Sequence, residues 1–499
     1  MTRNEAYARL IALDREIVLI DHMSATLSWD QEISLSPLGL EERSQQLGYL
    51  SQLRHGLSSS PEMGDLLALL DEWSDADEVQ HALIRIRKRE YEKMQKLPSR
   101  LVRSIAEQGV RAHSSWVAAR SAGAWSHFSK DLASMVSLVR EKARLLKGED
   151  ACLYDGLLDE FEPGMRTEEV AQLFDAIREP LVSLVDRLSS KAVDASFLYA
   201  SYPIKDQERF AREVLEAMRF DFNRGSCAVS VHPFTTTIGS DDVRITTRYS
   251  DPSVMDSFSS SVHEGGHALY EMGASCGALK GTSLASGASL GMHESQSRLW
   301  ENMIAKSPEF WQYYYPRFRE LFPSQTEGIS QEQFVQALNK VERTSIRVNA
   351  DEVSYSLHIM LRFSLEQKII SDEIAIDDIP EAWNTLHQEL LGCRPSSIQE
   401  GALQDVHWSS GDFGYFPTYA LGNLYGAQIW DAMKRELPIE SLLQNGKLGT
   451  ISDYLRTNIY ERGAIDTGVK TLIRVTNRGL DATLFTSYLE DKFSRLFGF

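Results

Sequence analysis

The sequence predicts a mostly α-helical protein with one small antiparallel β-sheet near residues 227–249. Amphipathic helical patterns fill the first two hundred or so residues, a run rich in Val, Ile and Thr follows, and helical patterns return from Val254 almost to the C-terminus. No internal repeat, low-complexity tract or linker separates these parts. We therefore expect a single unit over residues 1–499, with a helical N-terminal part (1–225) and a second part (226–499).

The helical prediction for the N-terminal part rests on apolar residues that recur at helical spacing between charged ones. Such stripes are usually the core-facing sides of helices. The clearest of these stretches are Arg3–Asp21, Asp77–Lys96, Leu101–Val110 and Asp131–Lys147.

The sheet prediction rests on residues 227–249. Two extended runs rich in Val, Ile and Thr flank the sequence Gly239-Ser240-Asp241-Asp242, which is typical of a turn. This pattern predicts a β-hairpin. The following helix is expected to begin at Asp256, and Gly273 is placed to end it.

Composition and charge exclude several classes of protein. The 499 residues include 71 acidic and 52 basic side chains, a net charge of −19, which disfavours binding to nucleic acid and to anionic membrane surfaces. The four cysteines form no C-x-x-C pair, so neither a thiolate zinc site nor a disulfide framework is indicated. The longest early apolar run, 17–20, is far shorter than a signal-peptide core. We expect a soluble, reduced, cytoplasmic protein.

The main chemical signal is His263-Glu264-Gly265-Gly266-His267. Residues four apart on a helix differ by only about 40° in direction, so both imidazoles face the same side. They can occupy two corners of a tetrahedral Zn²⁺ site, and Glu264 can reach a water there without ligating the metal. The segment predicts a catalytic metal centre.

A catalytic zinc site needs a third protein ligand and an open position. The metzincin extension is excluded, because Tyr270 and Gly273 stand where that class has glycine and histidine. The third ligand should then be a carboxylate downstream. The candidates are Glu271, Glu294 and Glu301.

Helix geometry ranks these carboxylates. Glu271 lies two turns from His263, about 12 Å along the helix, which is too far to share one ion easily. Glu294 begins a new helical pattern after a Gly/Ser/Ala loop that lets the second helix fold back. We favour Glu294, keep Glu301 in reserve, and expect His293 to support the ligands or to face the substrate.

Six short motifs occur in order between residues 232 and 408. They are His232-Pro233-Phe234, Asp242-Val243-Arg244-Ile245-Thr246, His263-Glu264-Gly265-Gly266-His267, His293-Glu294-Ser295-Gln296, Ile346-Arg347-Val348-Asn349-Ala350-Asp351 and Gly401-Ala402-Leu403-Gln404-Asp405-Val406-His407-Trp408. The chain resembles in all six the thermostable (Taq-type) metallocarboxypeptidase family, whose motifs are H-P-F, D-x-R-x-T, H-E-x-x-H, H-E-S-Q, I-R-x-x-A-D and G-x-x-Q-D-x-H-W. There is no departure at a motif position.

The resemblance implies a large helical, saddle-like, gluzincin-type peptidase with a deep groove, assembled as a homodimer. It implies metal-dependent removal of single amino acids from peptide C-termini with broad specificity. It places the ligands at His263, His267 and Glu294, with Glu264 as the catalytic carboxylate that acts as general base and acid. One divalent ion per subunit is expected; Zn²⁺ is favoured, and two histidines with a carboxylate also accept Co²⁺ or Mn²⁺.

Peptide hydrolysis also needs donors for the developing oxyanion. His407 and the aromatic residues Tyr415 and Tyr419 are suitable, and His232 is a further option. The sequence does not decide among them.

An exopeptidase must recognise a free C-terminal carboxylate, which arginine does best through its two-pronged guanidinium. Arg347 is the first choice, with Arg244 and Arg248 near the hairpin as alternatives. Asp351, one turn beyond Arg347, is expected to orient that arginine or a ligand histidine.

Two rival hypotheses remain. An oligopeptidase or dipeptidyl carboxypeptidase would use the same metal site and would release dipeptides or cut internally. A non-catalytic helical binding protein with a decayed site would have no reason to retain Glu264.

Overall fold

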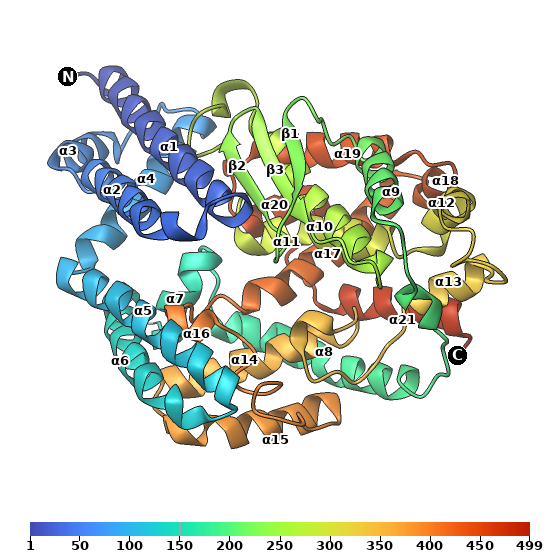
Figure 1. Cartoon of the computed structure of the whole chain (residues 1–499). Helices are drawn as coiled ribbons and strands as arrows, with labels where there is room; N and C mark the ends of the chain where they lie inside the picture. Colours follow the sequence, from blue (N-terminus) through green and yellow to red (C-terminus); the bar gives the residue numbers. More distant parts are fainter. Residues whose placement is uncertain (149–150) are drawn as a thin grey trace. The chain divides into compact units, whose positions relative to one another are not determined.

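The chain is shown in Figure 1 as a computed structural model that describes residues 1–148 and 151–499. It forms two compact units, each built from three segments. Unit 1 comprises Met1–Gln95, Asp194–Leu338 and Ile429–Gly479, and unit 2 comprises Lys96–Val193, Asn339–Gln428 and Leu480–Phe499. The expected single unit with its division near residue 225 stays a prediction.

Unit 1 contains helices from all three of its segments. They are α1 (Arg3–Ile33), α2 (Leu40–Ser58), α3 (Pro61–Leu70), α4 (Glu78–Lys96), α9 (Ile204–Ala217), α10 (Val254–Ala274), α11 (Leu290–Arg298), α12 (Pro308–Leu321), α13 (Gln331–Leu338), α18 (Ile439–Gln444), α19 (Leu448–Asn458) and α20 (Gly468–Thr476). A π-helical turn, η5 (Leu299–Ile304), follows α11 directly.

The described part of unit 2 is also helical. Its helices are α5 (Ser99–Ala122), α6 (Ser129–Leu146), α7 (Leu153–Phe161), α8 (Thr167–Leu188), α14 (Tyr355–Ile370), α15 (Ile379–Leu391), α16 (His407–Ser410) and α21 (Thr483–Phe497). Helix α17 (Pro417–Glu436) begins in unit 2 and ends in unit 1. The mostly α-helical prediction is confirmed, and the four stretches named from periodicity correspond to α1, α4, α5 and α6.

The small sheet is mixed, which corrects the expectation of an antiparallel sheet. Strands β2 (Thr235–Gly239) and β3 (Asp242–Thr247) form the predicted hairpin, but β1 (Gly225–Val229) pairs with β3 in parallel, in the order β1-β3-β2. After β1 the chain crosses the end of β3, where the Ser230 hydroxyl donates to Thr246 Oγ1 (2.6 Å). The second strand of the hairpin, β3, is therefore the central strand of the sheet, between β1 and β2.

Helix α10 packs against strands β2 and β3, as Figure 1 shows. The β3 side chains Val243 and Ile245 are fully buried, which makes the strand one wall of the unit 1 core. The helix begins at Val254, two residues earlier than expected, because Ser253 has the extended conformation of a residue that precedes a helix. Its expected terminator, Gly273, lies inside the last turn.

Two glycines of α10 serve close packing. A Cβ atom on Gly266 would lie 2.8 Å from the carbonyl oxygen of Gln296 and 2.9 Å from Ser297 Cα, both backbone atoms of α11. A Cβ atom on Gly273 would lie 2.4 Å from Cβ of Tyr460, a residue of the third segment of unit 1. Gly266 thus permits contact between the α10 and α11 backbones, and Gly273 makes room for Tyr460.

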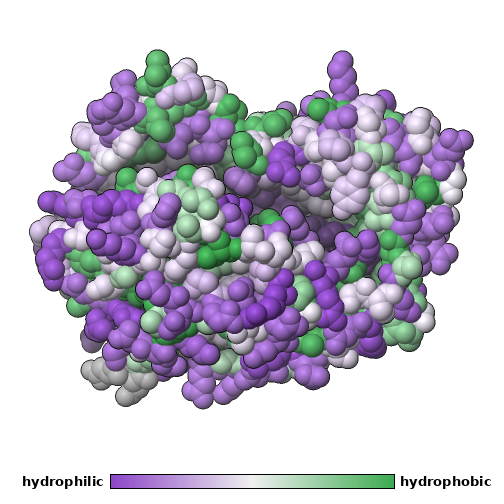
Figure 2. Space-filling model, turned by 60° about the horizontal axis from the view of Figure 1, so that its bottom comes forward, coloured by the Kyte–Doolittle hydropathy of each residue, from purple (hydrophilic) through white to green (hydrophobic). Residues whose placement is uncertain are grey.

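Residues 1–148 and 151–499 contain no helix that combines the length and apolar character needed to cross a membrane. On the face drawn in Figure 2, hydrophilic residues predominate and hydrophobic ones lie in small scattered groups. This surface agrees with the 25% of charged residues in the sequence.

We predict that Gly266→Ala lowers the free energy of unfolding by about 1–3 kcal/mol, because the added methyl meets backbone that cannot rotate away. Gly48→Ala is the matched control: this glycine also lies inside a helix, but a Cβ atom on it would have no neighbour within 4 Å. It should raise stability by about 0.5–1 kcal/mol through helix propensity. Denaturant titration of both metal-free proteins measures the difference, and equal effects would contradict the close-packing argument.

Candidate active site

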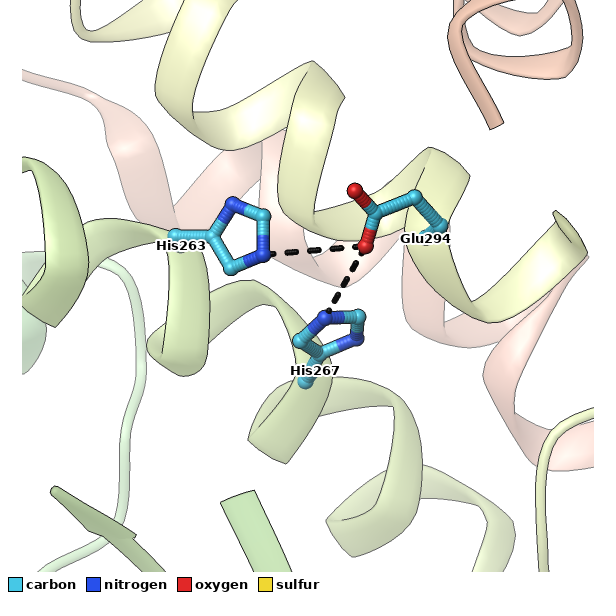
Figure 3. Close-up of side chains that lie close together, drawn as sticks. All are labelled: His263, His267 and Glu294. Carbon is cyan, nitrogen blue, oxygen red and sulfur yellow. Dashed lines mark ion pairs between the residues drawn. The ribbon is translucent and has the colours of Figure 1, made fainter. Parts of the chain in front are cut away.

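Helices α10 and α11 bring the predicted metal ligands together. His263 and His267 lie one turn apart on α10, and Glu294 lies in the first turns of α11. Its Oε2 atom is 3.6 Å from His263 Nε2 and 3.3 Å from His267 Nε2, and the three groups point toward one another in Figure 3. All three donor atoms lie within 4.8 Å of one another.

These residues fit a divalent metal ion. Two donors that each lie about 2.1 Å from a tetrahedral ion are about 3.4 Å apart, which matches both nitrogen–oxygen distances. Two imidazoles and one carboxylate also leave a fourth position open, as a catalytic centre requires. Of the three candidate carboxylates, the structure brings Glu294 to the two histidines.

The reserve candidate, Glu301, contacts the far side of the first histidine. Its Oε2 atom lies 2.9 Å from His263 Nδ1. Glu301 stands in the π-helical turn η5, and such turns are frequent at functional sites because they redirect side chains. With Nε2 toward the metal position, His263 donates its Nδ1–H to Glu301, which fixes the tautomer and the ring orientation.

A second chain of contacts holds the other histidine. His267 Nδ1 lies 2.6 Å from His293 Nδ1, and His293 Nε2 lies 2.8 Å from Glu271 Oε1. If His267 presents Nε2 to the metal, its Nδ1–H donates to His293, which in turn donates Nε2–H to Glu271. Glu271 thus contacts His293 and supports the metal ligand through it.

Burial and neighbouring charges set the ionisation of the ligands. Burial favours the neutral acid at Glu294, but Arg298 and the two histidines outweigh it and lower the pKa of Glu294 below its usual value. Burial lowers the pKa of His267. At His263, by contrast, burial is outweighed by the carboxylates of Glu294 and Glu301, which raise the pKa, so a metal ion there would displace a proton. An ionised carboxylate and a neutral imidazole are the forms that bind a cation.

Strand β2 orients Glu264 and Glu271 of α10. The Thr235 hydroxyl donates to Glu264 Oε2 (2.7 Å), and the Thr237 hydroxyl donates to Glu271 Oε2 (2.8 Å). Both threonines point to the same face because strand side chains alternate. Sequence reasoning missed them; the signal was a threonine pair at i and i+2 in the first strand of the hairpin, just before the two-histidine helix.

In unit 2, four predicted residues form one cluster: an arginine, two tyrosines and a histidine. The Arg347 guanidinium lies 5.1 Å from the Tyr419 ring centre, Tyr419 contacts Tyr415 edge-on (5.1 Å), and Tyr415 stacks on His407 (5.5 Å). Burial lowers the pKa of His407 to about 4, against the nearby carboxylate of Asp405. The imidazole is therefore neutral near pH 7 and can donate one hydrogen bond.

Arg347 is held by residues that sequence reasoning did not assign to the site. Its Nε and Nη2 atoms donate to Asp405 Oδ1 (3.2 and 3.0 Å), and its Nη1 atom donates to the Tyr355 hydroxyl (3.1 Å). Arg362 donates from Nε to the other oxygen of Asp405 (2.7 Å). Two signals were present: Asp405 lies inside the last motif, and Arg362 interrupts an otherwise apolar run of α14.

The two arginines outweigh burial and lower the pKa of Asp405 to about 2, with Arg362 contributing more than Arg347. Asp351, expected to orient Arg347, instead accepts hydrogen bonds from backbone N–H groups of Val353 (2.9 Å) and Ser354 (3.0 Å). Asp351 therefore shapes the start of α14, and Asp405 is the carboxylate in contact with Arg347.

The remaining predicted residues lie in unit 1 near the sheet. His232 is exposed in the connection between β1 and β2. Arg244 is half-buried on β3 and forms a two-pronged ion pair with Asp242 (2.8 and 2.6 Å). Arg248 is exposed and lies 3.2 Å from Asp256.

A helical fold in which two histidines and a glutamate can hold one divalent ion is typical of a metallopeptidase. The chain belongs to the carboxypeptidase Taq (M32) metallopeptidase family, whose model matches residues 9–493. This confirms the resemblance found in the sequence. The protein is thus a metallocarboxypeptidase, a peptide hydrolase that requires a divalent metal.

Individual relatives agree along the whole chain. Thermostable carboxypeptidase 1 of Thermus thermophilus is 38% identical over 100% of both chains. Carboxypeptidase 1 of Bacillus subtilis is 35% identical over 96% of each. The crystal structure of the M32 carboxypeptidase from Deinococcus radiodurans R1 superposes with a TM-score of 0.96 at 33% identity, covering 99% of this chain and 100% of that one.

We predict that removal of each ligand and of each supporting carboxylate weakens metal binding to different degrees. His263→Ala, His267→Ala and Glu294→Ala should abolish stoichiometric metal, whereas Glu301→Gln and Glu271→Gln should weaken the affinity about 10- to 100-fold. Calorimetric titration of the apo-proteins with Zn²⁺ measures both. Normal binding by Glu294→Ala together with complete loss in Glu301→Ala would mean that Glu301 is the third ligand.

Proposed function

We propose that the protein removes single amino acids from the C-termini of peptides with broad specificity, using one divalent ion held by His263, His267 and Glu294. The observation that carries this proposal is the convergence of the two Nε2 atoms on Glu294 Oε2, with Glu264 on the same helix. Zn²⁺ is our first choice of metal, and Co²⁺ or Mn²⁺ also suit this donor set. A homodimeric, cytoplasmic enzyme stays the prediction from sequence.

A bound ion would supply Lewis acidity that acidifies water and polarises the scissile carbonyl. Glu264 would take the proton of the attacking water and deliver it to the leaving amine nitrogen. The hydrogen bond from Thr235 supports this role, because it fixes the carboxylate through Oε2 and leaves Oε1 for the water. Thr235 would therefore set the direction of proton transfer.

Stabilisation of the oxyanion would fall to His407, Tyr415 and Tyr419, which form one cluster. The N–H of a neutral imidazole and the O–H of a phenol are suitable donors, because each can donate a hydrogen bond to the oxygen on which negative charge develops. His232 stays an alternative.

Recognition of the substrate carboxylate would fall to Arg347. Its guanidinium is buried and already oriented by Asp405 and Tyr355, so little side-chain entropy is lost on binding. Because Arg362 also contacts Asp405, two positive side chains share one carboxylate. The two arginines and Asp405 together therefore carry a net positive charge, which favours the binding of a C-terminal carboxylate.

The competing proposal is an oligopeptidase or dipeptidyl carboxypeptidase with the same metal site. Mass spectrometry of an N-blocked peptide, digested with and without chelator, separates the two. Successive loss of single residues that stops when chelator is added supports the proposal. Loss of dipeptides or internal cleavage supports the alternative.

We predict that Glu264→Gln binds metal and substrate normally but loses turnover by several orders of magnitude, since an amide cannot accept the proton. Thr235→Val is the companion variant: it keeps the carboxylate but removes its hydrogen bond, and kcat should fall by a much smaller factor. Metal content, KM and kcat are measured for both. Near-normal turnover of Glu264→Gln would remove this residue from the mechanism.

We also predict that a peptide with a free C-terminal carboxylate is cleaved at least about thirtyfold faster than its C-terminal amide, because only the carboxylate gains charge-assisted hydrogen bonds. Arg347→Lys should reduce this preference while keeping a positive charge beside Asp405. The ratio of kcat/KM values for acid and amide is the measurement.

Equal rates for acid and amide in the unaltered enzyme would contradict the carboxypeptidase mechanism. A preference that survives in Arg347→Lys but is lost in Arg244→Ala or Arg248→Ala would move carboxylate recognition to the hairpin.

A further inference from the structure

A fully buried carboxylate on α14 accepts three hydrogen bonds. Glu366 Oε1 accepts from Trp408 Nε1 (2.7 Å), and Oε2 accepts from the Tyr154 hydroxyl (2.6 Å) and from the backbone N–H of Gly414 (3.0 Å). Burial raises the pKa of Glu366 to about 7, although all three donors act in the opposite direction. Burying a carboxylate costs free energy, so the groups that bind it indicate its role in the protein.

Two of the three donors flank residues of the proposed active site. Trp408 directly follows His407, and Gly414 directly precedes Tyr415. Glu366 therefore binds both ends of segment 408–414. The rings at the two ends, His407 and Tyr415, stack at 5.5 Å with an interplanar angle of 27°.

The segment between them is closely packed. Gly414 has a φ of +91°, and a Cβ atom there would lie 2.7–2.9 Å from backbone atoms of Leu157 and Leu158 in α7. The Trp408 and Phe413 rings stack with an interplanar angle of 3°. The contact with α7 and the ring stack therefore restrict movement of the segment.

Helix α14 also holds the residues just before the segment. Arg362, one turn before Glu366 and fully buried, pairs with Asp405, two residues before His407. An arginine and a glutamate on one helix face thus fix the chain on both sides of this histidine.

We propose that Glu366 is a positioning residue of the peptidase reaction, which holds segment 408–414 so that His407 and Tyr415 keep the relative orientation needed to act on one substrate. This inference rests on the function proposed for those two residues. Glu366 itself does not touch the substrate; it acts through the segment.

The test is a cycle of variants of the metal-loaded enzyme, assayed with an N-blocked peptide that has a free C-terminal carboxylate. Glu366→Gln keeps the shape but cannot accept all three hydrogen bonds, and kcat should fall about 10- to 100-fold. In the background His407→Ala/Tyr415→Phe, the same change should cost less than about twofold, because nothing is left to position.

Tyr154→Phe is the matched control. It removes one donor from the carboxylate and leaves the Trp408 and Gly414 donors to Glu366 in place, so its kcat should fall less than about threefold. A loss equal to that of Glu366→Gln would overturn the proposal. Melting temperatures are measured for every variant, and Glu366→Asp, which is too short to reach both ends, replaces Glu366→Gln if that variant does not fold.

The outcomes separate the two hypotheses. If His407→Ala and Tyr415→Phe each leave kcat unchanged, their proposed function is wrong and the inference falls with it. If those variants are impaired but Glu366→Gln is normal, or equally damaging in both backgrounds, Glu366 serves stability alone and only the inference is overturned.

Discussion

The contact between the backbones of α10 and α11 is the constraint on which the metal site depends. Without a side chain at Gly266, the two helices approach until Glu294 reaches both histidines. The same approach brings each imidazole into contact with a supporting residue. His263 contacts Glu301, just beyond α11, and His267 contacts His293 on α11. The absence of a side chain at Gly266 therefore permits the approach that brings the candidate ligands and their supporting residues together.

Unit 2 follows a different principle, in which buried charge organises a cluster of aromatic side chains. Asp405 lies between Arg347 and Arg362, and all three are largely removed from water. Such charges are costly to bury unless each has good partners, so few alternative arrangements of the side chains are tolerated. These buried ion pairs therefore hold the Arg347 guanidinium and the neighbouring aromatic rings in one arrangement before substrate binds.

The sequence predicted what short-range spacing determines. Helical periodicity located the helices, the i, i+4 histidines share one face, and the favoured carboxylate, Glu294, lies beside both of them. Features that depend on long-range contacts were missed or wrong. The parallel pairing of β1 with β3 depends on where the connecting chain crosses, Gly273 serves the packing of Tyr460, and the carboxylate in contact with Arg347 is Asp405, fifty-eight residues away, rather than Asp351 nearby.

The interleaved segments of the two units have a consequence for how the protein is made. The candidate metal ligands all lie before residue 300, whereas Tyr460, which packs on Gly273 and Tyr270 of α10, comes from the last segment of unit 1. During synthesis, the candidate ligands on α10 and α11 are therefore present long before Tyr460 can pack on α10. Each unit receives its third segment only after residues 429–499 have been made, so neither reaches its final packing before then.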